Sequence, residues 1–191
     1  MTRVLRAAFP ASKIFVTDLD AVAVDWCVKQ YDCIPAANAL KADSFDLIWL
    51  GSVFTHLPAI AAENLLAELL PCLSESGVLV FSSQGRYAIA MLEAVIRDPE
   101  SFAPYARYNL DLDSIRSLVS GYHSSGYGYV DYPGKAGYGV CCAKPQWYAE
   151  RVTAGERHIQ IMLQEKGIDN HQDVSAFMRA DLLDARKGSL W

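Results

Sequence analysis

The stretch Phe45–Leu57 constrains the fold of this chain more than any other. Its first six residues form an apolar run with one acidic residue, and the run breaks at Gly51-Ser52 before a helix-start pattern at Pro58. A buried strand followed by a glycine turn and a helix is typical of the carboxyl edge of an α/β sheet. Small molecules bind at such edges, so the stretch predicts a ligand site as well as a strand.

Strand and helix patterns alternate along most of the chain. An earlier apolar strand, at 12–18, ends on Asp18-Leu19-Asp20 and leads into a helical pattern. Further strands are predicted at 34–37 and 78–81, and helices at 2–8, 86–97, 111–120, 145–151 and between Pro58 and Pro71. The segments 158–165 and 172–178 are expected to form an antiparallel hairpin. The alternation predicts three layers around a mostly parallel, doubly wound sheet that contains both strands 12–18 and 46–51.

The composition bounds the class of protein. With 191 residues, of which 52% are hydrophobic and 20% charged, the chain fits one domain over residues 1–191 with a sizeable core. A net charge of -5 does not favour binding to nucleic acid. The sequence also has no apolar run of about 18 residues, the length that would indicate a membrane span. The five cysteines lack metal-site spacing, which favours a reducing, cytoplasmic setting without disulfides or zinc.

Several segments, in their order and spacing, resemble class I S-adenosylmethionine (SAM) methyltransferases. They are Val16–Asp20, Ser44–Ile48, Ser52–Leu57, and Leu69–Pro71 with Ser76–Phe81; the later segments Tyr138–Val140 and His171–Val174 are similar to a bacterial subset of that family. The resemblance covers about residues 2–180. It implies a Rossmann-like fold, SAM as the cofactor, and methyl transfer to a small-molecule acceptor.

The resemblance also implies where the cofactor binds. It places the ribose hydroxyls at Asp18, beside Leu19, and the adenine at Asn38-Ala39, while Gly51-Ser52 would let the backbone approach the methionine part. Each position has a purely structural alternative. Asp18 and Asp20 can cap the following helix, Asn38 can be a turn residue, and Gly51 can simply ease the strand-to-helix turn.

Methyl transfer depends mainly on positioning a nucleophile in a site that excludes water, so a general base is optional. His56, just beyond the strand at 46–51, is one candidate base, and its alternative is a hydrogen-bonding group at the start of the helix. His171 with Asp173 is a second candidate, as a base with its orienting carboxylate, against a merely polar edge hairpin. The Tyr- and Gly-rich segment 121–139, too rich in glycine for a helix, is expected to be a lid or acceptor-side insertion, against a surface aromatic cluster.

One departure from the family pattern is large. No glycine precedes Gly51, so the glycine-rich loop that cradles the cofactor has no counterpart, nor has the central strand before it. We therefore expect an N-terminally truncated version of the fold in which strands 12–18 and 46–51 pair directly or another chain fills the gap. Exposed strand edges then predict self-association and, without the loop, weak SAM binding.

Two other functions stay open. An apolar strand followed by Asp18-Leu19-Asp20 also resembles haloacid-dehalogenase-type phosphatases, with Asp18 as nucleophile, Asp20 as acid/base and Ser82 as a phosphate contact, but no late acidic pair for magnesium follows. The other possibility is a catalytically impaired remnant or oligomerisation module that keeps the methyltransferase-like fold without its cofactor site.

Overall fold

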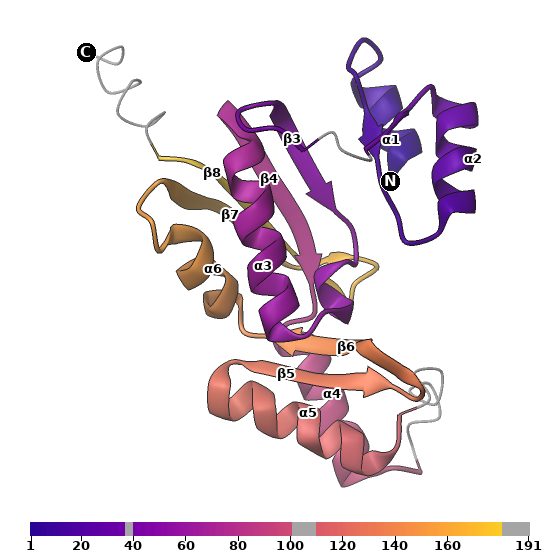
Figure 1. Ribbon diagram of the computed structural model, residues 1–191. Helices are drawn as coiled ribbons and strands as arrows, with labels where there is room; N and C mark the ends of the chain where they lie inside the picture. Colours follow the sequence, from indigo (N-terminus) through magenta and orange to yellow (C-terminus); the bar gives the residue numbers. More distant parts are fainter. Residues whose placement is uncertain (37–39, 101–109, 181–191) are drawn as a thin grey trace.

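The main sheet has four strands in the order β3-β4-β8-β7. The computed structural model describes residues 1–36, 40–100 and 110–180 (Figure 1). In the main sheet, β3 (Phe45–Leu50) and β4 (Leu73–Ser83) are parallel, and β8 (Gln172–Arg179) is antiparallel to β4 and to β7 (His158–Ile168). The predicted C-terminal hairpin is therefore confirmed. Within the described ranges, no helix is long and apolar enough to cross a membrane.

A separate small unit precedes the main sheet. Its strands β1 (Phe15–Val16) and β2 (Ile34–Pro35) form a parallel pair beside α1 (Thr2–Ala8) and α2 (Ala21–Tyr31). The Arg6 guanidinium ties the unit together, because it donates to the carbonyl oxygens of Ser12, Tyr31 and Asp32 at 2.7–2.8 Å.

The prediction that strands 12–18 and 46–51 share one sheet is wrong, because β1 and β3 lie in different sheets. Nor do they pair directly with each other. A cavity of about 700 Å³ separates them, and in the described part of the chain no strand lies in it to bond to both edges.

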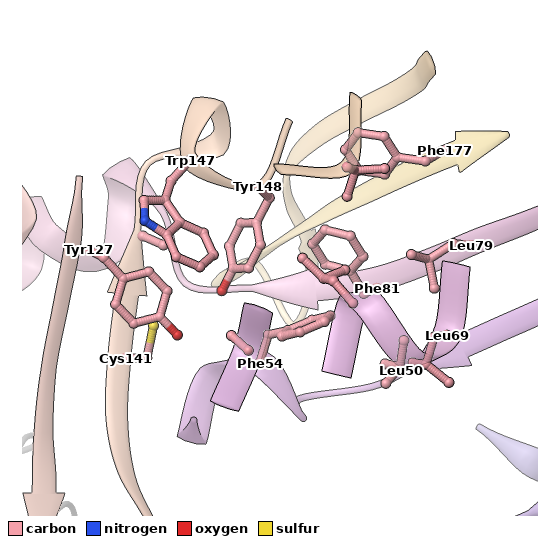
Figure 2. Packing of buried hydrophobic residues seen from close by; sticks show 14 of the residues in the cluster. Leu50, Phe54, Leu69, Leu79, Phe81, Tyr127, Cys141, Trp147, Tyr148 and Phe177 are labelled. Atoms are coloured by element: carbon pink, nitrogen blue, oxygen red, sulfur yellow. The ribbon is translucent and has the colours of Figure 1, made fainter. Parts of the chain in front are cut away.

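One face of the main sheet carries the larger core (Figure 2). Leu79 and Phe81 of β4 and Phe177 of β8 point to this face, where α3 (Ala59–Leu69) and α6 (Pro145–Thr153) cover them. Phe81 contacts Phe54 in the short helix η1 (Phe54–His56), with ring centroids 4.8 Å apart, and stacks on Phe177 at 5.7 Å. Each such side chain contributes roughly 1.5–3 kcal/mol through burial. A second short helix, η2 (Leu70–Cys72), joins α3 to β4.

A second core lies around a hairpin that the sequence did not predict. Strands β5 (Tyr127–Tyr132) and β6 (Lys135–Ala143) are antiparallel, and α4 (Arg86–Arg97) and α5 (Leu112–Ser125) pack against them. The segment 121–139 is thus the end of a helix and a hairpin, and the expectation that it cannot be helical is wrong for residues 121–125. Gly128 and Gly139 are needed because a Cβ would collide with the carbonyl oxygens of Leu118 and Val130.

The two cores also change the predicted layering. In the described residues, α4 and α5 form their own core with the hairpin instead of a third layer over one continuous sheet. Tyr127 joins the two parts: its ring lies in the larger core, and its hydroxyl donates to the Leu57 carbonyl at 2.7 Å. The hairpin is therefore fixed against the loop that follows β3.

Candidate functional site

Ser52 occupies a strained and tightly held position at the carboxyl end of β3. Its φ of 58° lies in the left-handed region that non-glycine residues rarely adopt. Three neighbours hold it there: its N–H donates to Ser82 Oγ at 2.8 Å, its hydroxyl lies 2.8–2.9 Å from both amide atoms of Gln172, and its carbonyl accepts from Thr55 Oγ1 at 2.7 Å. The predicted strand edge is therefore polar and ordered, built from β3, β4 and β8.

His56, in η1, lies against the hairpin. Its Nδ1 is 2.8 Å from the Gly139 carbonyl oxygen, and its ring stacks on Tyr138 with centroids 5.0 Å apart and lies 5.9 Å from Tyr132. Because a carbonyl only accepts, Nδ1 carries the proton, and in the neutral imidazole Nε2 is then the basic nitrogen. His56 is therefore held against the hairpin through Nδ1.

Asp173, at the start of β8, is 1% exposed. Its Oδ1 accepts from the Lys166 N–H at 3.0 Å, and Oδ2 has no hydrogen-bond partner among the described residues. Oδ2 lies against Gly85, where a Cβ would collide with it, so the carboxyl group sits at the N-terminus of α4. Burial raises the pKa of Asp173, while the Lys166 hydrogen bond and the charges of Arg86 and His171 lower it.

His171 lies in the turn between β7 and β8, with its ring edge-on to Tyr87 at 6.0 Å. It also lines a cavity of about 10 Å³ together with Gln84 and Val140, a space that is the size of one water molecule. His171 lies two residues before Asp173, and its charge lowers the pKa of Asp173. Their pairing as base and orienter stays a prediction.

The predicted ribose ligand, Asp18, follows β1. Its Oδ1 accepts from the Asp20 N–H at 2.9 Å, while Asp20 Oδ1 accepts from the Val22 N–H at 2.9 Å and caps α2. The helix-capping alternative is therefore confirmed for Asp20. Asp18 is exposed, and Leu19 is 93% exposed. The predicted adenine contacts, Asn38 and Ala39, lie outside the described residues.

Gly51 follows β3 and is exposed, with the indole of Trp49 as its near neighbour; a Cβ there would be 3.0 Å from Trp49 Nε1. The structure thus groups the predicted residues into three clusters. Gly51, Ser52 and His56 follow β3, His171 and Asp173 adjoin the end of β4, and Asp18 with Leu19 follows β1 in the other sheet.

Sequence reasoning missed the groups that hold these residues in place. Ser82, Gln172 and Gly139 contact Ser52 or His56 from positions 30 to 120 residues away in the chain. One signal was available: Ser82-Ser83-Gln84 directly follows the apolar run 78–81, so a second polar strand end could be read from it. Over the described ranges, no group of three or more His, Cys, Asp or Glu side chains could hold a metal ion.

Comparison with known proteins identifies the fold. No protein-family model and no curated protein matches the chain. Among solved structures, PH0226 from Pyrococcus horikoshii OT3 matches with a TM-score of 0.56 at 7% identity, over 93% of this chain and 76% of that chain. LepI in complex with SAM matches with a TM-score of 0.54 at 11% identity, over 93% of this chain and 39% of that chain.

A third match is the O-methyltransferase family 2 protein from Planctomyces limnophilus DSM 3776 in complex with apigenin, with a TM-score of 0.52 at 12% identity, over 93% of this chain and 46% of that chain. This chain spans less than half the length of LepI and of the O-methyltransferase. The matches include both the β1–β2 unit and the main sheet, because they cover nine-tenths of the chain. The chain therefore has the fold of class I SAM-dependent methyltransferases.

Proposed function

We propose that the protein takes part in SAM-dependent methyl transfer to a small-molecule acceptor. The observation that carries the proposal is the polar strand edge at Ser52, Ser82 and Gln172, which lies where α/β sheets bind ligands. The fold, which it shares with a structure of LepI that contains SAM, supports the same assignment.

The proposed cofactor residues of this chain are assigned to three parts of SAM. Asp18, with Leu19, is proposed for the ribose, Gly51-Ser52 for the methionine part and Asn38-Ala39 for the adenine. The exposed Gly51 leaves room for close backbone approach, whereas the Ser52 N–H is already taken by Ser82. When bound, SAM supplies an activated methyl group. No glycine precedes Gly51 in the sequence, so none of these residues forms the glycine-rich turn that the resemblance implies, and the proposal includes weak SAM binding.

On the acceptor side, His56 is proposed as the general base. Its Nδ1–H donates to Gly139, which orients the ring and leaves Nε2 to take a proton. Tyr132 and Tyr138 pack around the imidazole of the half-buried His56. His171 with Asp173 is the alternative pair, and the hairpin β5–β6 is proposed as the acceptor-side insertion.

The test is binding of S-adenosylhomocysteine by equilibrium dialysis at millimolar concentration. Asp18→Ala should weaken binding by about 1.5–3 kcal/mol, or about 10- to 150-fold, the usual range for a hydrogen bond to a charged group. Asp25→Ala is the matched control, because Asp25 is an exposed carboxylate on α2 in the same small unit. Equal affinities of the two variants would remove Asp18 from the site.

A second candidate function is a non-catalytic interaction module with the methyltransferase fold. The cavity between β1 and β3 favours it, because that cavity separates the two strands that lead to Asp18 and to Gly51. A module of this kind would bind neither SAM nor S-adenosylhomocysteine in the dialysis experiment, although its main sheet would be fully formed.

A further inference from the structure

Each polar group of Ser52 already has a partner in the protein. Its N–H donates to Ser82 Oγ at 2.8 Å, and its carbonyl oxygen accepts from Thr55 Oγ1 at 2.7 Å. Its hydroxyl donates to Gln172 Oε1 at 2.9 Å and accepts from Gln172 Nε2 at 2.8 Å. Ser52 can therefore serve a bound ligand through its conformation more directly than through a side-chain contact.

The hydrogen bond from the Ser52 N–H fixes the direction of the peptide that joins Gly51 to Ser52. In a trans peptide the N–H and the C=O point in opposite directions. Because the N–H points to Ser82 at the end of β4, the Gly51 carbonyl oxygen points away from β4. Gly51 is exposed, so a carbonyl in this direction is an acceptor for the ammonium group in the methionine part of SAM.

This peptide orientation needs support from outside the loop. Ser52 has a φ of 58°, and a serine stays in that region only when its surroundings hold it there. Thr55 lies three residues away in the same loop, and Ser82 lies on the neighbouring strand. Gln172 adds a hold from β8, and its amide binds the hydroxyl with both of its polar atoms.

The turn between β7 and β8 sets the position of Gln172. Asp169 and Asn170, with φ of 51° and 52°, form a tight turn, and Gln172 follows as the first residue of β8. Since β8 is antiparallel to β4, with Val174 opposite Ser82, its first residues lie at the carboxyl ends of β3 and β4 (Figure 1). The fold thus brings the Gln172 amide to the loop that follows β3.

We propose that Gln172 is a positioning residue for the proposed cofactor site. Its amide holds the Ser52 hydroxyl and thereby keeps the Gly51–Ser52 peptide in the orientation that offers the Gly51 carbonyl to the methionine part of the ligand. Gln172 itself does not contact the ligand. The inference rests on the proposed function, because it requires an adenosyl ligand at this edge of the sheet.

The test compares two ligands by equilibrium dialysis at millimolar concentration. S-adenosylhomocysteine contains the amino-acid part, and methylthioadenosine lacks it. Gln172→Met keeps the length of the side chain but has no amide, so the Ser52 hydroxyl loses both of its bonds. The variant should bind S-adenosylhomocysteine about tenfold more weakly and methylthioadenosine with unchanged affinity. A residue that only anchored the loop would not separate the two ligands in this way.

Three further variants make the test specific. Gln164→Met is the matched control, because Gln164 is an exposed glutamine on β7 of the same hairpin, and it should leave the affinity for both ligands unchanged. In a Ser52→Gly background, Gln172→Met should cause no further loss, because glycine adopts a positive φ without help from a hydroxyl. Circular dichroism checks folding. Ser52→Ala removes the same two bonds from the other side and should give the same selective loss, so it tests the proposal if Gln172→Met does not fold.

The outcomes separate this inference from the proposed function. If neither ligand binds to the unaltered chain, the proposed function is contradicted, and this inference with it. If S-adenosylhomocysteine binds no more tightly than methylthioadenosine, the methionine part makes no contact and this inference alone is overturned. It is also overturned if Gln172→Met leaves the affinity for S-adenosylhomocysteine unchanged, weakens both ligands equally, or causes the same loss in the Ser52→Gly background.

Discussion

Removing the Tyr127 hydroxyl should loosen the joint between the hairpin and the main sheet. That hydroxyl donates to the Leu57 carbonyl at 2.7 Å, and Leu57 directly follows His56. Tyr127→Phe leaves the carbonyl without its buried donor, which costs about 1–2 kcal/mol in the free energy of unfolding. In a domain of this size that loss lowers the melting temperature by roughly 2–8 °C.

Tyr148→Phe is the matched control for this prediction. Tyr148 lies in the same core, with its ring 6.4 Å from that of Tyr127, but its buried hydroxyl donates to no backbone carbonyl in the described part of the chain. Removing it should change the unfolding free energy less than Tyr127→Phe does, because no backbone carbonyl loses its donor. Differential scanning calorimetry measures both variants. Equal destabilisation of the two would refute the reasoning, since lost packing and not the bond to Leu57 would then explain the effect.

Three further predictions follow from the structure. Burial raises the pKa of Asp173 above its ordinary value of 3.8. The folded state therefore keeps a proton that the unfolded chain has already released. As a result, the unfolding free energy falls as the pH rises from 3.8 through the raised pKa. Asp173→Asn should flatten this fall in urea titrations at a series of pH values above 3.8, and an unchanged slope would exclude Asp173 as its source. Burial also raises the pKa of Cys141 to about 12 and that of Cys142 well above its ordinary value. A thiol reagent should therefore label Cys27 first, and Cys141 and Cys142 only on unfolding. Mass spectrometry of the labelled peptides checks this order. Self-association of the chain should involve the exposed edge strand β7. Leu163→Lys, at a position on β7 that is 42% exposed, should then lower the mass measured by light scattering. An unchanged mass would place the contact elsewhere.

The sequence predicted the local elements well because their signals are local. Asp20 caps α2 as expected, Pro58 precedes α3, and β7 and β8 form a hairpin from the two predicted strand segments. Periodicity and capping act within a few residues, so they can be read directly from the chain.

Contacts between distant segments could not be read in this way. The Ser52 contacts to Ser82 and Gln172, and the hydrogen bond of His56 to Gly139, join elements whose relative position depends on the whole fold. The prediction that segment 121–139 is a lid or insertion without helix was wrong in part for a similar reason. Gly128 and Gly139 allow close backbone approach inside an ordered hairpin, whereas glycine content alone suggests a loop.

The cavity between β1 and β3 was predicted only in part. The absence of glycine before Gly51 predicts an interruption of the sheet between strands 12–18 and 46–51. Direct pairing of the flanking strands, one of the two expected outcomes, does not occur, because α1 and the β1–β2 pair fold as their own unit held by Arg6.

Calorimetric titration with SAM tests most directly the central claim that this chain alone binds the cofactor weakly. It compares the chain alone with a protein in which a strand and a Gly-x-Gly turn are fused before Met1. The account predicts weak binding by the chain alone and a gain of about tenfold or more in the fused protein, because the turn supplies the backbone amides that the middle of the cofactor needs. Micromolar binding by the chain alone as a monomer, or no binding by either protein, would contradict the account.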